Sequence, residues 1–454
     1  MLKNNPIHGR SLLLALAAAL LILAVPLLAH ASNNGLNLRP RAMFDSVFGT
    51  IQNSYIKTNV DDEGQFVTGT TGGDPTLPGD NDKRLLFGYP DDIWTSFSSV
   101  RIVTDTASVD YRLEDEPPAA GPTVVGDEVT TSWTTDSVKI EQLLSLASNP
   151  FTGREDTTKI VYTVTNNNNT VYTVGVRCML DVRIGDNDGA PYFIPGVGTV
   201  TNETEFLAPN TPAYWKAFES ATFAADSLKG QGLMEGSGAT PPDRFVVVQW
   251  PGIYGSVWDY SVTSSLPVTG DSAVALYWNP VPLPPGESAT FVTYYGLGGP
   301  GGGSTFIEGP VAVTCDELQF GADLFVVNTT GTDFQGGSST INLPSGLELA
   351  PGESPTKSMS DVPPGEARSV SWQIVADGTV DGALSYSATT TFTEGPEPLT
   401  ADATVEVPQC GETPVGGVTL GGQPLRAALL WAALASLTGL VLGGSIFALK
   451  RRAG

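Results

Sequence analysis

Histidine is almost absent from this 454-residue sequence. The chain holds two, His8 and His30, and both lie within its first 31 residues. The rest of the chain has no imidazole, which excludes Ser-His-Asp and Cys-His catalysis, histidine general bases and imidazole-ligated zinc there. Chemistry based on carboxylates alone remains open, because glycoside hydrolysis needs only a suitably spaced pair of acidic residues.

Cysteine is scarce as well, with three residues in the whole chain. Cys315 and Cys410 frame a segment of strand-like sequence, one before its first strand and one after its last. In an exported protein this placement predicts a disulfide that ties the ends of the segment together. Cys178 lies in the apolar face of a predicted strand, so we expect a buried side chain rather than a nucleophile.

Basic residues are few compared with acidic ones. The formal net charge is −25, and residues 32–423 carry 17 basic and 48 acidic side chains, a net charge of −31. Such a surface repels nucleic acids and anionic lipids and attracts cations, so we expect no nucleic-acid partner. Solubility or a salty habitat would also account for the charge, without any specific role for a cation.

Two long apolar runs lie near the ends of the chain. The first, at 12–28, follows Lys3 and Arg10 and precedes Ala29-His30-Ala31. A basic start, a short apolar centre and small residues at this spacing predict a signal peptide at 1–31, with an uncleaved anchor as the alternative.

The second apolar run, at 427–449, contains no charged residue and is followed by Lys450, Arg451 and Arg452. At the helical rise it would extend over about 34 Å, enough to cross a bilayer. The run therefore predicts a transmembrane helix at 427–449 and a cytoplasmic tail at 450–454. We expect a single-pass cell-surface protein whose N-terminal part lies outside the cell.

Between these runs the composition favours β-structure. The chain has 51 Gly and 34 Pro, and its short alternating segments are separated by Gly, Pro, Asn and Asp. The pattern predicts an all-β protein: a large sandwich at 32–300, an Ig-like sandwich at 301–410 and a linker at 411–426. The clearest strand pair spans 157–184 around a turn at 166–169. On its second strand, alternate residues from Tyr172 to Ile184 are apolar, which predicts one buried face.

Two sets of motifs resemble known β-modules. The segments LAPGE at 349–353, VPPGE at 362–366 and SVSW at 369–372 resemble bacterial Ig-like repeats of the CARDB type. That resemblance implies spacing, adhesion or binding rather than catalysis. The segments PPGES at 284–288, FVTYYG at 291–296 and IGDNDGAP at 184–191 resemble the supersandwich of galactose-mutarotase-like and glycosidase-associated proteins. Mutarotases use histidines beside their catalytic carboxylate, so the missing histidines put that activity in doubt.

Aromatic and charged residues of the first module suggest a carbohydrate site. Flat rings can cover the C–H faces of a sugar, while carboxylate and guanidinium groups bind its hydroxyls. Rings that fill the space between sheets and a salt-bridged solvent face are the alternative interpretations. The candidate ligand-binding residues are Arg177, Asp181, Arg183, Tyr214, Trp215, Trp250, Tyr254, Trp258 and Tyr260.

An acidic loop follows the strand that ends near Ile184. Asp186, Asn187 and Asp188 precede a glycine and alternate oxygen ligands as a Ca²⁺ loop does. No glutamate follows at EF-hand spacing, so a plain Asx-rich turn is the alternative. We treat Ca²⁺ as the one cofactor that the sequence suggests.

Three functions fit these observations. The leading one is a non-catalytic surface protein that binds glycan or another envelope component through its β-modules. The others are a membrane-anchored glycosidase or lyase that uses carboxylates, and a structural envelope or sheath subunit. The missing histidines favour binding over catalysis.

Overall fold

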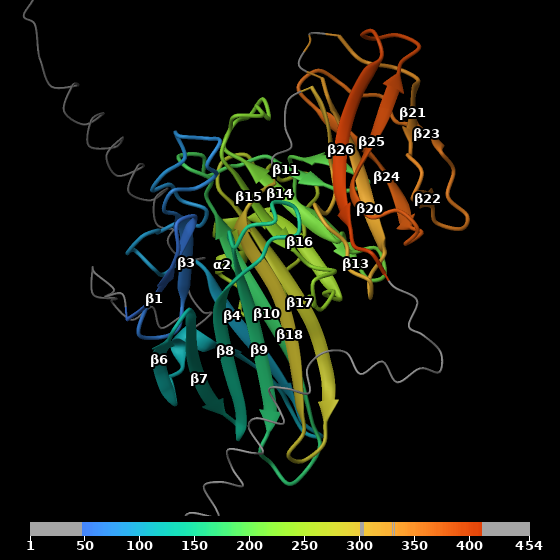
Figure 1. Ribbon diagram of the computed structural model, residues 1–454. Helices are drawn as coiled ribbons and strands as arrows, with labels where there is room; N and C mark the ends of the chain where they lie inside the picture. Colours follow the sequence, from blue (N-terminus) through green and yellow to red (C-terminus); the bar gives the residue numbers. More distant parts are fainter. Residues whose placement is uncertain (1–47, 300–303, 329, 331, 411–454) are drawn as a thin grey trace, which may run out of the picture.

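The computed structural model describes residues 48–299, 304–328, 330 and 332–410, and strands dominate this part of the chain (Figure 1). We call residues 48–299 the first region and residues 304–410, apart from 329 and 331, the second region. No helix among the described residues is long and apolar enough to cross a membrane. The predicted signal peptide (1–31), linker (411–426), transmembrane helix (427–449) and tail (450–454) all lie outside the described residues.

Two large antiparallel sheets form the first region. The nine-stranded sheet has the order β12-β11-β14-β15-β18-β9-β8-β7-β6, and the six-stranded sheet has the order β13-β16-β17-β10-β4-β5. The strands of the larger sheet are β6 (Ala120–Val125), β7 (Glu128–Thr135), β8 (Val138–Ala147), β9 (Thr157–Asn166), β11 (Tyr192–Ile194), β12 (Gly198–Val200), β14 (Tyr214–Phe218), β15 (Lys229–Leu233) and β18 (Ser288–Leu297). Those of the smaller sheet are β4 (Phe97–Val103), β5 (Ser108–Arg112), β10 (Tyr172–Val182), β13 (Thr204–Leu207), β16 (Arg244–Gln249) and β17 (Ser272–Leu283).

The core lies between these two sheets. Val176, Cys178 and Leu180 of β10 share one apolar cluster with Tyr162 of β9 and Tyr295 of β18. Between Val174 and Ile184, the six alternate apolar side chains are each at most 2% exposed. The predicted buried face is therefore confirmed. Burying apolar surface on this scale is the main favourable term in folding.

The predicted strand pair at 157–184 is corrected by the structure. β9 pairs with β8 and β18, whereas β10 pairs with β4 and β17, so the two strands lie in opposite sheets. The turn at 166–169 carries the chain from one sheet to the other. Each of the two strands has one apolar face. When the strands lie in opposite sheets, these two faces pack against each other, which buries more apolar surface than a hairpin whose two apolar faces lie on the same side of one sheet. The segments 97–112 and 128–147 each contain two strands, β4 with β5 and β7 with β8.

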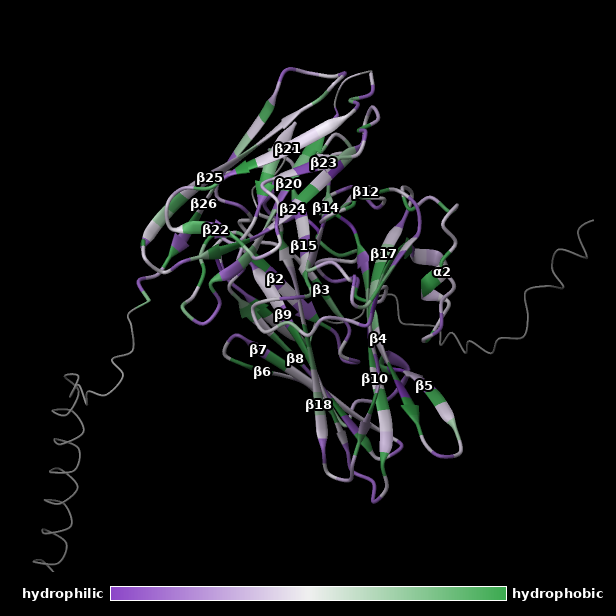
Figure 2. Ribbon diagram, turned by 90° about the vertical axis from the view of Figure 1, so that its right-hand side faces the viewer, coloured by the Kyte–Doolittle hydropathy of each residue, from purple (hydrophilic) through white to green (hydrophobic). Residues whose placement is uncertain are grey.

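The remaining elements of the first region pack around this sandwich. A three-stranded sheet adds Ile51, Ile56 and Val60 to the core, and α2 lies against the six-stranded sheet. Figure 2 shows α2 on the side of β4 and β17 that faces away from β9 and β18. These elements are β1 (Gly49–Gln52), β2 (Ile56–Val60), β3 (Phe66–Thr70), the 3₁₀ turn η1 (Leu113–Asp115) and α2 (Trp250–Tyr254).

The second region contains two four-stranded sheets around its own apolar core, which includes Leu324, Trp372 and Tyr386. It is a β-sandwich, as predicted; the assignment to the Ig-like group stays a prediction. One sheet consists of β19 (Thr305–Glu308), β20 (Gln319–Val327), β24 (Ala367–Ala376) and β22 (Leu347–Leu349). The other consists of β23 (Thr356–Met359), β21 (Gly337–Asn342), β25 (Gly382–Thr391) and β26 (Leu399–Val407).

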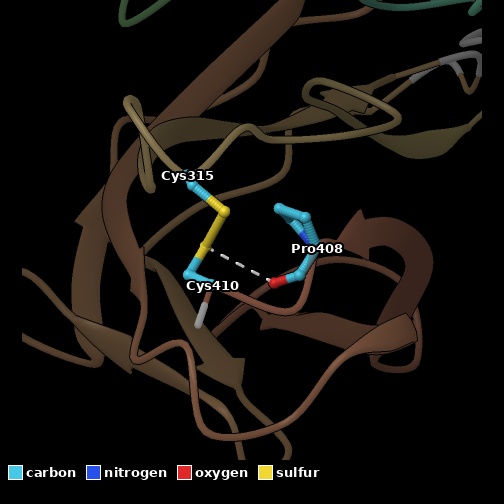
Figure 3. The surroundings of a disulfide bond; sticks show 3 residues. All are labelled: Cys315, Pro408 and Cys410. Carbon is cyan, nitrogen blue, oxygen red and sulfur yellow. Dashed lines mark hydrogen bonds between the residues drawn. A yellow bond between two sulfur atoms is a disulfide. The ribbon is translucent and has the colours of Figure 1, made fainter. Parts of the chain in front are cut away.

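The predicted disulfide between Cys315 and Cys410 is confirmed. The two Cα atoms are 5.4 Å apart, and the bond links residues 95 positions apart in the sequence (Figure 3). The carbonyl oxygen of Pro408 lies 3.6 Å from Sγ of Cys410. The bond therefore ties the chain that leaves β26 to the segment that leads into β20.

Candidate ligand-binding site

Most of the predicted aromatic residues cover the outer face of the six-stranded sheet. Trp250, Tyr254, Trp258 and Tyr260 pack with Met179 and with residues of β16 and β17 in an apolar cluster. Trp258 is 5% exposed, and the other three rings are partly buried. The rings form a packed layer over the outer face of the sheet, and they do not fill the space between the two sheets.

Arg177 lies beneath this aromatic layer and is fully buried. Its guanidinium donates hydrogen bonds to the carbonyl oxygens of Ser256 (2.8 Å) and Ile253 (3.2 Å), and it lies 5.3 Å from the centre of the Phe97 ring. Burial lowers the pKa of Arg177 to about 10. The residue therefore holds the 253–258 segment on the sheet and is not available to a ligand in this arrangement.

Tyr214 and Trp215 are adjacent in the sequence but lie on opposite faces of β14. Trp215 stacks on Tyr295 in the core between the sheets, with ring centres 5.3 Å apart. Tyr214, Lys216 and Phe218 face the second region. Consecutive residues of a strand point to opposite sides, so only one of the two predicted aromatic residues can reach a site on either face.

Asp181 and Arg183 lie beside the edge of the aromatic layer, where Trp250 donates hydrogen bonds to the backbone carbonyls of Thr95 (3.1 Å) and Asp271 (3.3 Å). Asp181 is 1% exposed and faces Asp188 and Asp271, while Arg183 forms an ion pair with Asp188. Of the predicted calcium ligands, only Asp188 joins this group of carboxylates, which is the group among the described residues that can hold a metal ion. The nine predicted ligand-binding residues are therefore spread over separate places.

A cleft lies where the two regions meet. It has a volume of about 670 Å³. Phe151, Tyr214, Leu233 and Glu235 line it from the first region. From the second region it is lined by Val313, Glu317, Gln319, Phe320, Asp323, Ser371 and Gln373, among others. A concave surface of this size that combines apolar and polar groups is the usual form of a small-molecule site.

The floor of the cleft contains a buried carboxyl group. Asp323 accepts a hydrogen bond from the Tyr214 hydroxyl at 2.9 Å and another from the Ser371 hydroxyl. Burial raises the pKa of Asp323 to about 6, against the smaller opposing effect of these hydrogen bonds. Perturbed pKa values in a cleft are a feature of functional sites, although structural networks produce them too.

The rim of the cleft is polar and acidic. Glu235, Glu317, Gln319 and Gln373 are exposed. The side-chain amide of Gln319 donates a hydrogen bond to Oε1 of Gln373 at 3.3 Å. None of the described residues that line the cleft is Lys, Arg or His. The cleft therefore disfavours anionic ligands.

Contacts beside the cleft hold its two walls together. Phe193 and Phe218 of the first region pack with Phe306 and Phe325 of the second region. Lys216 donates a hydrogen bond of 2.5 Å to Glu308, and both side chains are at most 2% exposed. A shared apolar cluster and a buried ion pair give the cleft a defined shape.

Sequence reasoning found Tyr214 but missed the rest of the cleft. Asp323, for example, directly precedes the apolar run at 324–327, and an acidic residue at such a position is normally solvated. The one available signal was Lys216 within the apolar segment 214–218, since a lysine there requires a buried partner. The partner, Glu308, is 92 residues away.

Comparisons with known proteins give no family. No family model matches the sequence, and no curated protein matches it. A solved polysaccharide lyase is 13% identical with a TM-score of 0.29; the match covers 81% of this chain, which spans 47% of the length of the lyase.

Two solved mutarotase-like proteins are similar over a smaller part of the chain. A galactose mutarotase related enzyme from Lactobacillus acidophilus is 8% identical over 56% of this chain and 97% of its own, with a TM-score of 0.33. A galactose mutarotase-like protein from Lactobacillus casei is 10% identical over 55% and 99%, with a TM-score of 0.29. These likenesses assign neither a family nor an activity to the chain.

Proposed function

We propose that this chain is a non-catalytic cell-surface protein that binds an uncharged saccharide in the cleft between its two regions. The observation that carries the proposal is the lining of the cleft, which combines Phe151, Tyr214 and Phe320 with acidic and amide side chains and has no basic residue among those described. Sugars offer apolar C–H faces to rings and hydroxyl edges to carboxylates and amides. Both kinds of partner are present here.

The charge of the cleft selects among saccharides. Glu235, Glu317 and Asp323 line it without a basic neighbour in the described lining, so uronates and sulfated sugars would meet repulsion and find no guanidinium partner. A neutral glycan has no such penalty. The location at a cell surface rests on the predicted signal peptide and the predicted membrane span.

The residues available favour binding over turnover. Carboxylates are the acid–base groups of the cleft, and residues 32–454 contain no histidine. The Asp323 carboxyl already accepts hydrogen bonds from Tyr214 and Ser371, which fits a fixed structural or recognition role. The carboxylate enzyme and the envelope subunit are the alternatives that the experiment must separate.

The test is to screen the purified full-length protein against neutral and anionic glycans, followed by calorimetry on any that bind. We expect neutral glycans to bind, and Gln373→Ala to weaken binding about 10-fold because it removes a hydrogen-bonding group from the rim. Gln52→Ala is the matched control, since Gln52 is exposed on β1 outside the cleft lining. It should leave the affinity unchanged.

Other outcomes decide against the proposal. Absence of binding to every neutral glycan, or equal losses in Gln373→Ala and Gln52→Ala, would contradict it. New reducing ends or unsaturated uronates in the same incubations would replace it with the enzyme. Ordered assembly of the protein without any glycan bound would support the envelope subunit instead.

A further inference from the structure

Three carboxylates meet where β10 ends. Asp181 belongs to β10, Asp188 lies in the loop that follows, and Asp271 directly precedes β17. Because β10 and β17 are antiparallel, with Asp181 opposite Ala273, the end of one strand lies beside the start of the other. One oxygen from each carboxylate lies within 4.8 Å of the others.

Two of these carboxylates have oxygens that are buried and lack a hydrogen-bond partner. Asp181 is 1% exposed, and its Oδ1 accepts no hydrogen bond; Oδ1 of Asp188 is also buried and unpaired. Buried polar atoms are nearly always hydrogen-bonded, so buried acceptors without a protein partner, on carboxylates that converge, point to a site for water or an ion.

The charge of the group is only partly compensated. Arg183 lies nearby, with Nη1 3.4 Å from Oδ2 of Asp188, which leaves a net charge of −2 when all three carboxylates are ionised. A divalent cation would balance this charge and give the buried oxygens a partner.

We propose that Asp181, Asp188 and Asp271 bind one hard divalent cation such as Ca²⁺. Carboxylate oxygens are the ligands that these ions prefer, and the partial exposure of Asp188 and Asp271 leaves room for water to complete the coordination. The ion would join the loop after β10 to the segment before β17. Its role is structural and independent of the cleft.

The site differs from the loop site that the sequence suggested. The Asp186 side chain is 81% exposed and lies 3.8 Å from Arg84, and the Asn187 amide donates to the Glu219 carbonyl at 2.9 Å. Asp188 is the member that the two sets share. The other ligands come from the strand before the loop and from a segment about 80 residues later.

The experiment uses the full-length protein after removal of metals with EDTA. Calorimetric titration with CaCl2 and, separately, MgCl2 should show saturable binding of one ion per chain by at least one of them. The same ion should raise Tm relative to NaCl at equal ionic strength. Asp181→Asn should weaken binding by about 10-fold or more, because even outer partners of a metal site contribute this much.

Asp186→Asn is the matched control. It removes the same charge at an exposed position in the loop that follows β10, so the isotherm should not change. Asp271→Asn provides a second test at a half-buried position if Asp181→Asn does not fold. Lack of saturable binding with both ions, or an equal loss in Asp186→Asn, would overturn the proposal. Gln373→Ala should bind the ion normally, which separates this result from that of the cleft.

Discussion

Asp323 shows how one buried residue couples the fold to pH. Its side chain accepts hydrogen bonds from Tyr214 and Ser371, and burial raises the pKa of its carboxyl to about 6, compared with 3.8 for an exposed aspartate. Between these two values the folded protein binds a proton that the unfolded chain releases. The contribution of Asp323 to stability is therefore greatest at low pH and falls as the pH rises from about 4 to about 6.

The prediction at this scale concerns Asp323→Asn, which cannot ionise. The free energy of unfolding of the variant, relative to the unmodified protein, should increase by about 2–3 kcal/mol between pH 4 and pH 7. Urea denaturation at the two pH values measures the difference. Asp381→Asn is the control, because Asp381 is exposed in the second region. A difference that does not depend on pH would show that Asp323 ionises as freely in the folded protein as in the unfolded one.

For Cys178, the local alternation of apolar residues was sufficient to predict that the side chain is buried. It was predicted as a buried apolar side chain, and it is fully buried among the alternate apolar residues of β10. Burial raises the pKa of its thiol to about 11, so the reactive thiolate is scarce at neutral pH. The prediction of a buried, unreactive position agrees with both observations.

At the scale of elements, the six-stranded sheet is covered on both faces. One face meets the nine-stranded sheet, and the other carries α2 and the aromatic layer. This explains why Arg177, on the face opposite Cys178, is buried rather than solvated. The backbone carbonyls of Ser256 and Ile253 accept hydrogen bonds from its guanidinium, in the place that water would take at an exposed site.

Replacing Arg177 tests this arrangement. Arg177→Met should lower the free energy of unfolding by about 2–4 kcal/mol, because the backbone carbonyls of the 253–258 segment lose their charged donor. Urea denaturation gives the value, and limited proteolysis should show faster cleavage near 250–260. Arg183→Met, on the same face of the chain but one quarter exposed, should cost less. An equal cost for both variants would argue against the role assigned to Arg177.

At the scale of the whole molecule, the two regions are joined by buried contacts. Lys216 and Glu308 form an ion pair that is almost completely buried, next to the cluster of Phe193, Phe218, Phe306 and Phe325. Burial lowers the pKa of Lys216, while the charge of Glu308 opposes this effect. The pair is therefore favourable only while both partners are present.

Replacing one partner of this pair should lower the free energy of unfolding more than replacing both partners. Lys216→Met leaves Glu308 buried without its cation and should cost about 3–5 kcal/mol, whereas Lys216→Met with Glu308→Leu should recover most of that loss. Urea denaturation of the two variants and the unmodified protein provides the comparison. If the double variant is no more stable than the single one, the cost comes from lost packing and not from an unpaired charge. A fall in glycan affinity in the single variant alone would link the pair to the shape of the cleft.

The sequence by itself determined the features that depend on local spacing. Period-two alternation identified the buried face of β10 and the position of Cys178, and the placement of Cys315 and Cys410 identified the disulfide. These predictions succeed because side-chain direction along a strand is a property of the backbone. The β-sandwich class follows from the same patterns, repeated along the chain.

Only the tertiary structure decided which strands pair and which side chains meet. Every strand offers the same hydrogen-bonding groups, so nothing local distinguishes a hairpin of β9 and β10 from a crossing between two sheets. The meeting of Tyr214 with Asp323, and of Asp181 with Asp271, follows from those pairings across about 90 to 110 residues of sequence. Such contacts form because burying the faces of two sheets and of two regions stabilises the folded protein. No single segment of the sequence therefore determines which strands pair.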